Sequence, residues 1–303
     1  MPMDKALFSR VGIAAALKGA AARPVVRRLA YALALLLMVG GTWVSFSKIE
    51  LRFSDLSWSP LVALVLLGIP ATVALNALEM ELSANFISRR FGLRRSLTLT
   101  VFASASNMLP LPGAAMVRVA GLASVGGTVR RATAVTLLIA LMWLGVAFAF
   151  SGAFLLSTAP LMGGLALAVG LSMVTGLVGW GRVLTGRWRT GLRLVALKAC
   201  LVTVSVARLY LCFMIIGEPA LPGQVVIFAI SGIVGSAVSI VPAGLGVREL
   251  VSAGLAPLVG LSAASAFLAT ALDRVVGMIV MVGLAAVLTA ADLRPTPAED
   301  KAA

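Results

Sequence analysis

Long apolar segments are the feature that most restricts how this chain can fold. A helix needs roughly 20 mostly apolar residues to cross the hydrocarbon core of a bilayer. Stretches of about this length occur at residues 29–46, 60–85, 132–155, 161–181, 194–216 and 262–289. The chain is 60% hydrophobic and only 12% charged, whereas a soluble domain is about 45–50% apolar because its surface must be polar. The sequence therefore predicts an all-α polytopic membrane protein.

Basic residues between the apolar segments predict the orientation and the domain limits. The net charge is +14, and the cations gather in short loops at residues 89–95, 130–131 and 182–193. Such loops stay on the cytoplasmic side of a membrane protein. We expect a basic cytoplasmic N-terminal segment (1–28), one transmembrane domain (29–289) and a short polar cytoplasmic tail (290–303). This pattern is typical of a multi-pass protein of the bacterial inner membrane.

Two further apolar stretches are interrupted by proline and glycine. Residues 97–124 contain Asn107-Met-Leu-Pro-Leu-Pro-Gly113, and residues 224–259 contain Val241-Pro-Ala-Gly-Leu-Gly-Val-Arg-Glu249. These residues break the helical hydrogen-bond ladder. A first stretch that returns to its own side keeps all basic loops cytoplasmic. We therefore predict about six spans plus two re-entrant hairpins in an inverted-repeat arrangement, which is typical of transport sites at the midplane. Eight spanning helices with kinks are the alternative.

Ionisable residues inside the apolar segments are candidates for a functional site. A charge at the bilayer centre costs on the order of 3 kcal/mol, so it needs a partner or a polar cavity. Arginine binds phosphate through its planar fork of donors. The candidate lipid head-group or transport site comprises the break residues and the charges beside them: Asn107, Pro110, Arg118, Pro242, Gly244, Gly246, Arg248, Glu249, Asp273 and Arg274. Arg208 and Glu79 are secondary candidates.

Structural pairing between helices is the other interpretation of these charges. Two examples of such pairs are Glu249 with Arg274 and Arg248 with Asp273. For Glu79, Glu81 and Lys198 a structural role is favoured over a functional one. Lys198 and Arg208 could also extend along the apolar surface, with the Lys198 ammonium reaching the inner interface.

Nothing in the sequence predicts catalysis, a metal or a cofactor. Histidine is absent, which removes the commonest general base and metal ligand. The two cysteines, Cys200 and Cys212, lie in one apolar segment and are typical of unpaired packing residues. We expect a protein that is not an enzyme, binds no cofactor or metal, and uses its basic residues for topology and for lipid head groups rather than for nucleic acid.

The second interrupted motif, residues 241–249, followed by Asp273 and Arg274, resembles the C-terminal signature of the lysylphosphatidylglycerol synthase transmembrane family. That family includes the flippase domain of the multiple peptide resistance factor. Residues 107–110 with Arg118 are similar to its first signature, an Asn-Leu-Leu-Pro element followed by Gly-Glu and an arginine. Here Ala114 and Ala115 stand in place of the Gly and Glu. The resemblance covers about residues 29–289 and includes no aminoacyl-transferase domain.

This resemblance implies a stand-alone, flippase-like protein that moves a lipid or lipid-linked molecule between leaflets. Membrane lipids with an anionic or zwitterionic head group would be the partners, and transport could be coupled to protons through Glu249 and Asp273. Two alternatives remain open. One is a non-transporting subunit or enzyme partner in lipid-linked glycan or hopanoid metabolism, and the other is a transporter of a small polar solute. The sequence predicts no oligomeric state.

Overall fold

The computed structural model describes residue 36 and residues 39–47, 56–106, 113–218, 220–232 and 246–292. All regular elements in these ranges are helices. Several predicted features lie outside the described residues: the N-terminal segment 1–28, half of the first span, most of the tail, and the site candidates Asn107, Pro110, Pro242 and Gly244.

Five helices are long and apolar enough to cross a membrane. The first is continuous from Trp58 to Asn85 and consists of α4 (Trp58–Ala63), a π-helical turn η2 (Leu64–Gly68) and α5 (Ile69–Asn85). The others are α8 (Val129–Leu155), α9 (Pro160–Thr185), α10 (Trp188–Ile215) and α14 (Ala263–Asp292). They confirm the five predicted helices that fall within the described residues. Residues 39–47 of the first predicted span are also helical.

The π-helical turn η2 lies where the first long helix meets Pro70. A proline has no N–H group to donate to the preceding turn, and a single wide turn of this kind is the usual form of a π-helix. Gly68 ends the turn, and a Cβ atom added there would lie 2.7 Å from Cγ of Arg208. The absent side chain therefore lets Arg208 of α10 pass close to the backbone of this helix.

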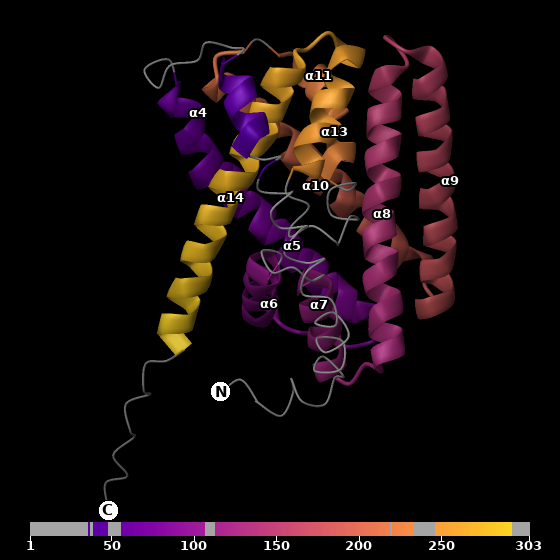
Figure 1. The fold of residues 1–303 in the computed structure, drawn as a ribbon. Coiled ribbons are helices and arrows are strands. Elements are labelled where there is room, and N and C mark those ends of the chain that lie inside the picture. Colours follow the sequence, from indigo (N-terminus) through magenta and orange to yellow (C-terminus); the bar gives the residue numbers. More distant parts are fainter. Residues whose placement is uncertain are drawn as a thin grey trace, which may run out of the picture.

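Helices α8 and α9 form an antiparallel pair whose backbones approach closely at glycines (Figure 1). A Cβ atom at Gly152 would lie 2.3 Å from the backbone nitrogen of Leu167, and one at Gly170 would lie 2.4 Å from that of Ala149. Small residues allow this approach, which provides van der Waals contact where lipid leaves no hydrophobic driving force between helices.

Gly170→Ala is expected to lower the free energy of unfolding by about 1–3 kcal/mol, because the new methyl group overlaps backbone atoms that cannot move aside. Gly164→Ala on the same helix is the matched control, since nothing lies within 4 Å of the position of its Cβ atom. Unfolding of the two variants in detergent, followed by tryptophan fluorescence, measures the difference. Equal stability of the two variants would contradict the close packing of α8 on α9.

Helices α6 (Leu93–Ser106) and α7 (Gly113–Ser124) form an antiparallel hairpin around the first interruption. At the open end, Nη2 of Arg95 donates to Oγ of Ser124 at 2.7 Å. At the other end, a Cβ atom at Gly113 would lie only 2.2 Å from the carbonyl oxygen of Ser106. The chain therefore returns, after the interruption, to the end of the molecule from which α6 started.

The second interrupted stretch is also an antiparallel hairpin. Its first arm contains α11 (Pro222–Val226) and helical residues 229–232, and its second arm contains α13 (Val247–Leu255) and the 3₁₀ turn η4 (Ala256–Val259). Nε2 of Gln224 donates to the carbonyl oxygen of Val259 at 2.8 Å, and Oγ of Ser252 donates to Oγ of Ser231 at 2.9 Å. The first bond joins the start of the first arm to the end of the second, and the other joins the end of the first arm to the middle of the second.

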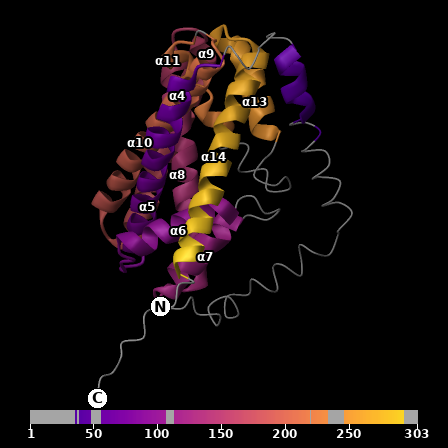
Figure 2. The same ribbon diagram turned by 90° about the vertical axis from the view of Figure 1, so that its left-hand side faces the viewer.

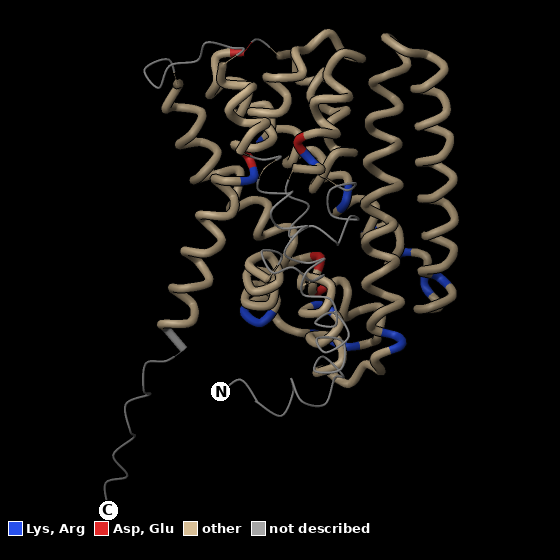
Figure 3. Tube along the Cα trace, in the orientation of Figure 1, with Lys and Arg blue, Asp and Glu red and all other residues tan. Residues whose placement is uncertain are grey.

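The two hairpins lie at opposite ends of the helical bundle (Figures 1 and 2). The first lies at the end where most of the Lys and Arg positions gather (Figure 3). There, Nη2 of Arg131 donates to the carbonyl oxygens of Phe86 at 3.2 Å and of Leu184 at 2.8 Å, which ties together the start of α8, the end of α9 and the turn after α5. Most of the Lys and Arg positions therefore share one end of the bundle, and their placement on the cytoplasmic side stays a prediction.

Candidate functional site

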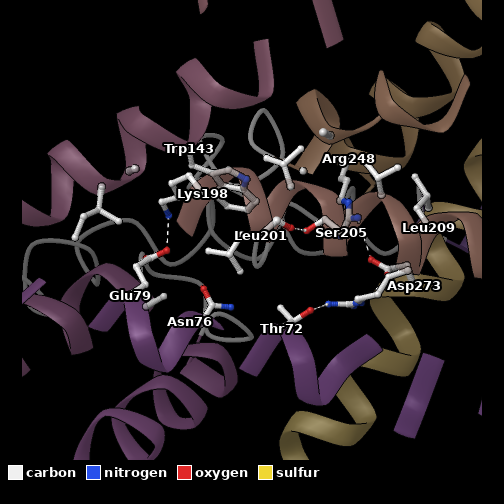
Figure 4. A pocket seen from close by; sticks show the side chains of 18 of the residues that line it. Thr72, Asn76, Glu79, Trp143, Lys198, Leu201, Ser205, Leu209, Arg248 and Asp273 are labelled. Atoms are coloured by element: carbon white, nitrogen blue, oxygen red, sulfur yellow. Dashed lines mark hydrogen bonds and ion pairs between the residues drawn. The ribbon is translucent and has the colours of Figure 1, made fainter. Parts of the chain in front are cut away.

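A cavity of about 400 Å³ lies between α5, α7, α8, α10, α14 and the second hairpin (Figure 4). Its size falls within the range of small-molecule sites, which is about 300–1,000 Å³. Six charged residues are among those that line it: Glu79, Arg118, Lys198, Arg208, Arg248 and Asp273. The cavity is unusual for a bundle of apolar helices, because ionisable side chains in such helices are costly unless they are paired or face a polar space.

The Glu79 cluster, which consists of Glu79, Arg118 and Lys198, occupies one part of the cavity. Glu79 is 1% exposed, and each of its carboxylate oxygens has its own cation. Nζ of Lys198 lies 2.5 Å from Oε2, and Nη1 of Arg118 pairs with Oε1. The Lys198 ammonium group also lies 5.5 Å from the centre of the Trp143 ring, a position in which the negative face of the ring attracts a cation.

The Asp273 cluster, which consists of Asp273, Arg208 and Arg248, occupies another part. Nη2 of Arg208 lies 2.7 Å from Oδ1 of Asp273, and Nη2 of Arg248 lies 3.0 Å from Oδ2. Nη1 of Arg208 also donates to Oγ1 of Thr72 at 3.1 Å. The Nε–H groups of Arg208 and Arg248 are buried and form no hydrogen bond with any described residue. The cluster therefore contains hydrogen-bond donors that are not used.

The two clusters have the same design. In each, one carboxylate joins two cations, one cation coming from α10 and the other from the helix that follows an interruption, α7 or α13. Each cluster therefore has one positive charge in excess. The sequences between the two arms of each hairpin, residues 107–112 and 233–245, contain no ionisable residue that could neutralise it. Burying an uncompensated charge is expensive, so the cavity is suited to an anion.

A polar face of α5 and α10 runs between the clusters. Thr72, Asn76 and Glu79 recur at helical spacing on α5, and Ser205 lies between the two cations of α10. Figure 4 shows Asn76 between Glu79 and Thr72. The Asn76 amide forms no hydrogen bond within the described part of the chain. Thr72, Asn76 and Ser205 were not predicted as site residues, although the three- and four-residue spacing of polar residues in an apolar span is a detectable signal.

Glu249 and Arg274 form a further ion pair beside the Asp273 cluster. Glu249 is fully buried, and Nη1 of Arg274 lies 2.9 Å from its Oε1 and 3.1 Å from its Oε2. This contact joins α13 to α14 and does not line the cavity. Glu81 is likewise structural, because it accepts hydrogen bonds from the backbone N–H groups of Phe91 and Gly92, which close the turn before α6.

The structure tests several predictions about these charges. Both predicted pairs, Arg248 with Asp273 and Glu249 with Arg274, are confirmed. The prediction that Lys198 and Arg208 extend along the apolar surface is wrong, because each turns inward to a carboxylate on a neighbouring helix. Both cysteines are free, as predicted.

The sequence candidates separate into three groups. Arg118, Arg248 and Asp273, with the secondary candidates Glu79 and Arg208, come together at the cavity. Gly246, Glu249 and Arg274 do not line it. Gly246 caps the start of α13 with a φ of 80°, a left-handed conformation that glycine adopts without strain. The remaining four candidates lie outside the described residues.

Ala114 and Ala115 both line the cavity. Helix α7 contains no Asp or Glu, so no carboxylate extends from it to neutralise the Glu79 cluster. Comparisons of the sequence with models of known protein families and with curated proteins found no match. The fold and the site define the class of this protein: an α-helical membrane protein whose helices surround a cavity that is lined by more cations than carboxylates.

Proposed function

We propose that this protein moves a lipid or lipid-linked molecule with an anionic head group between the two leaflets of a membrane. The observation that carries the proposal is the cavity charge, four cations against two carboxylates in a bundle of apolar helices. Guanidinium groups bind phosphate oxygens through paired N–H donors. A zwitterionic head group gains less, because both carboxylates already have two cationic partners each.

The topology we propose has two re-entrant hairpins that enter from opposite faces, together with about six spans. The antiparallel arms of α6–α7 and of residues 222–259 at opposite ends of the bundle support it. The basic end would face the cytoplasm, by the preference of Arg and Lys for that side. We propose a bacterial inner membrane as the location, from the basic loops, and membership of the lysylphosphatidylglycerol synthase transmembrane family, from the motif resemblance alone.

In the proposed mechanism the head group passes through the cavity while the acyl chains stay in lipid. The cations compensate the charge of the phosphate, whose passage through bare hydrocarbon would be prohibitively expensive. No step requires a covalent change. The polar residues of α5 and α10 would provide hydrogen bonds between the clusters.

A transporter of a small anionic solute is the second candidate. A cavity of about 400 Å³ could enclose a free anion as well as a head group. Movement of such an anion into protein-containing vesicles, without any movement of lipid, would favour this function over lipid translocation.

Arg118→Gln and Arg248→Gln are each expected to reduce lipid flux at least about tenfold, because each removes a charge-assisted hydrogen-bond donor worth roughly 1.5–3 kcal/mol to the anion. Flux of fluorescent phosphatidylglycerol in reconstituted vesicles, with and without a pH gradient, measures the effect. Arg94→Gln is the matched control, since Arg94 is exposed at the basic end. Wild-type flux no faster than in protein-free vesicles under either condition would refute the proposed function.

A further inference from the structure

We propose that the cavity contains two oxyanion-binding stations, the Glu79 cluster and the Asp273 cluster, and that each binds one phosphate group at the same time. The chemical class of the ligand is a phosphodiester or a comparable monoanionic phosphate. The identification of the phosphate as part of a lipid head group rests on the proposed function. The existence of the two stations is argued from the charge and the geometry of each cluster.

Charge determines the number of ligands. Each cluster joins two cations to one carboxylate and keeps one positive charge. A phosphodiester carries one negative charge, so one such group per cluster brings the cavity to neutrality. The Glu249–Arg274 pair provides a comparison within the same molecule. It is already neutral and does not line the cavity, as a purely structural pair should be.

Each cluster has donors left for a second acceptor after its carboxylate is bound. At the Asp273 cluster Arg248 contributes only Nη2 to the ion pair, and its side chain is 21% exposed. At the Glu79 cluster Arg118 contributes only Nη1 to the ion pair, and its side chain is 21% exposed. A guanidinium group has five N–H donors, so a phosphate oxygen can bind without displacing either carboxylate.

The two clusters are too far apart for one phosphate group to contact both. Lys198 and Arg208 are ten residues apart on α10, which corresponds to about 15 Å along the helix. One phosphate group cannot reach both clusters, so the two stations fill separately. This distance is about half of the hydrocarbon thickness, which is about 30 Å.

Asn76 lies between the stations and is the residue that we expect a phosphate to contact during transfer. On α5 it lies between Glu79, which belongs to the Glu79 cluster, and Thr72, which contacts Arg208 of the Asp273 cluster (Figure 4). Its amide has no partner among the described residues, whereas Thr72 already accepts a hydrogen bond from Arg208. A donor without charge suits a point of passage, since it binds the anion more weakly than either station.

Native mass spectrometry of the purified full-length chain, titrated with phosphatidylglycerol, tests the number of stations. The wild type should retain two phosphatidylglycerol molecules, and an equal concentration of phosphatidylcholine should not displace them. Arg118→Gln and Arg248→Gln each neutralise one cluster, so each variant should retain one molecule and the double variant none. Arg94→Gln, which removes one charge at the basic end, should retain two.

Two results would overturn the inference: a single retained molecule that either variant abolishes, or retention that neither variant changes. Equilibrium dialysis with labelled inorganic phosphate separates the possible sources. Two bound inorganic phosphates, reduced to one by each variant, with no retained lipid would support the stations and refute lipid translocation. One retained lipid together with rapid flux would refute the two stations and leave the proposed function intact.

Discussion

Glu79→Gln is expected to lower the free energy of unfolding by about 3–5 kcal/mol, the usual effect of removing one partner from a buried ion pair. Glu79 and Lys198 are 1% and 3% exposed, respectively. The substitution keeps the shape of the side chain but leaves Lys198 and Arg118 without a counter-charge. The Trp143 ring near Lys198 is expected to offset part of this loss, on the order of 2 kcal/mol for a desolvated cation.

The double variant Glu79→Gln/Lys198→Met tests whether the unbalanced charge causes this loss of stability. It restores the original excess of one positive charge, carried by Arg118, whose side chain reaches the cavity. Most of the lost stability should return, as is often found when both partners of a buried pair are replaced by residues of similar volume. Unfolding in mixed detergent micelles measures all three proteins. A double variant less stable than Glu79→Gln alone would contradict the charge argument and indicate that Lys198 stabilises the bundle by packing.

Arg274→Met alone should be destabilising by a similar amount, about 3–5 kcal/mol, because it leaves the fully buried Glu249 carboxylate without its partner. Glu249→Met/Arg274→Met removes both charges and should recover most of the loss. The same unfolding measurement compares the single and double variants, and the interaction energy of the two substitutions follows from their cycle.

This pair also tests the hypothesis that Glu249 is a proton site. Because the pair lies outside the cavity lining, we expect the double variant to keep wild-type lipid flux and the same dependence of flux on pH. A double variant that folds but loses the pH dependence of flux would assign Glu249 to proton coupling instead of to helix pairing.

The helices and their limits were largely predictable from the sequence. The apolar run at 132–155 corresponds to α8 (Val129–Leu155), and the run at 262–289 corresponds to α14 (Ala263–Asp292). Whether a segment of about 20 apolar residues can cross the hydrocarbon core depends on that segment alone. The spans can therefore be predicted without knowing how the helices pack. The pairs that join α13 to α14 were named as examples, but the sequence alone could not choose them, because Arg248 and Glu249 are adjacent and so are Asp273 and Arg274.

The site itself required the tertiary structure. Glu79 and Lys198 are 119 residues apart, and no local pattern tells which carboxylate a given cation will meet. That choice depends on how α5 and α10 are rotated and how deep each residue lies, and both depend on packing contacts such as that of Arg208 at Gly68. The sequence by itself determined that charges had to be buried in apolar helices, since their cost is local. Only the packed bundle decided that four cations and two carboxylates share one cavity, because the positions of distant helices determine which charges come together.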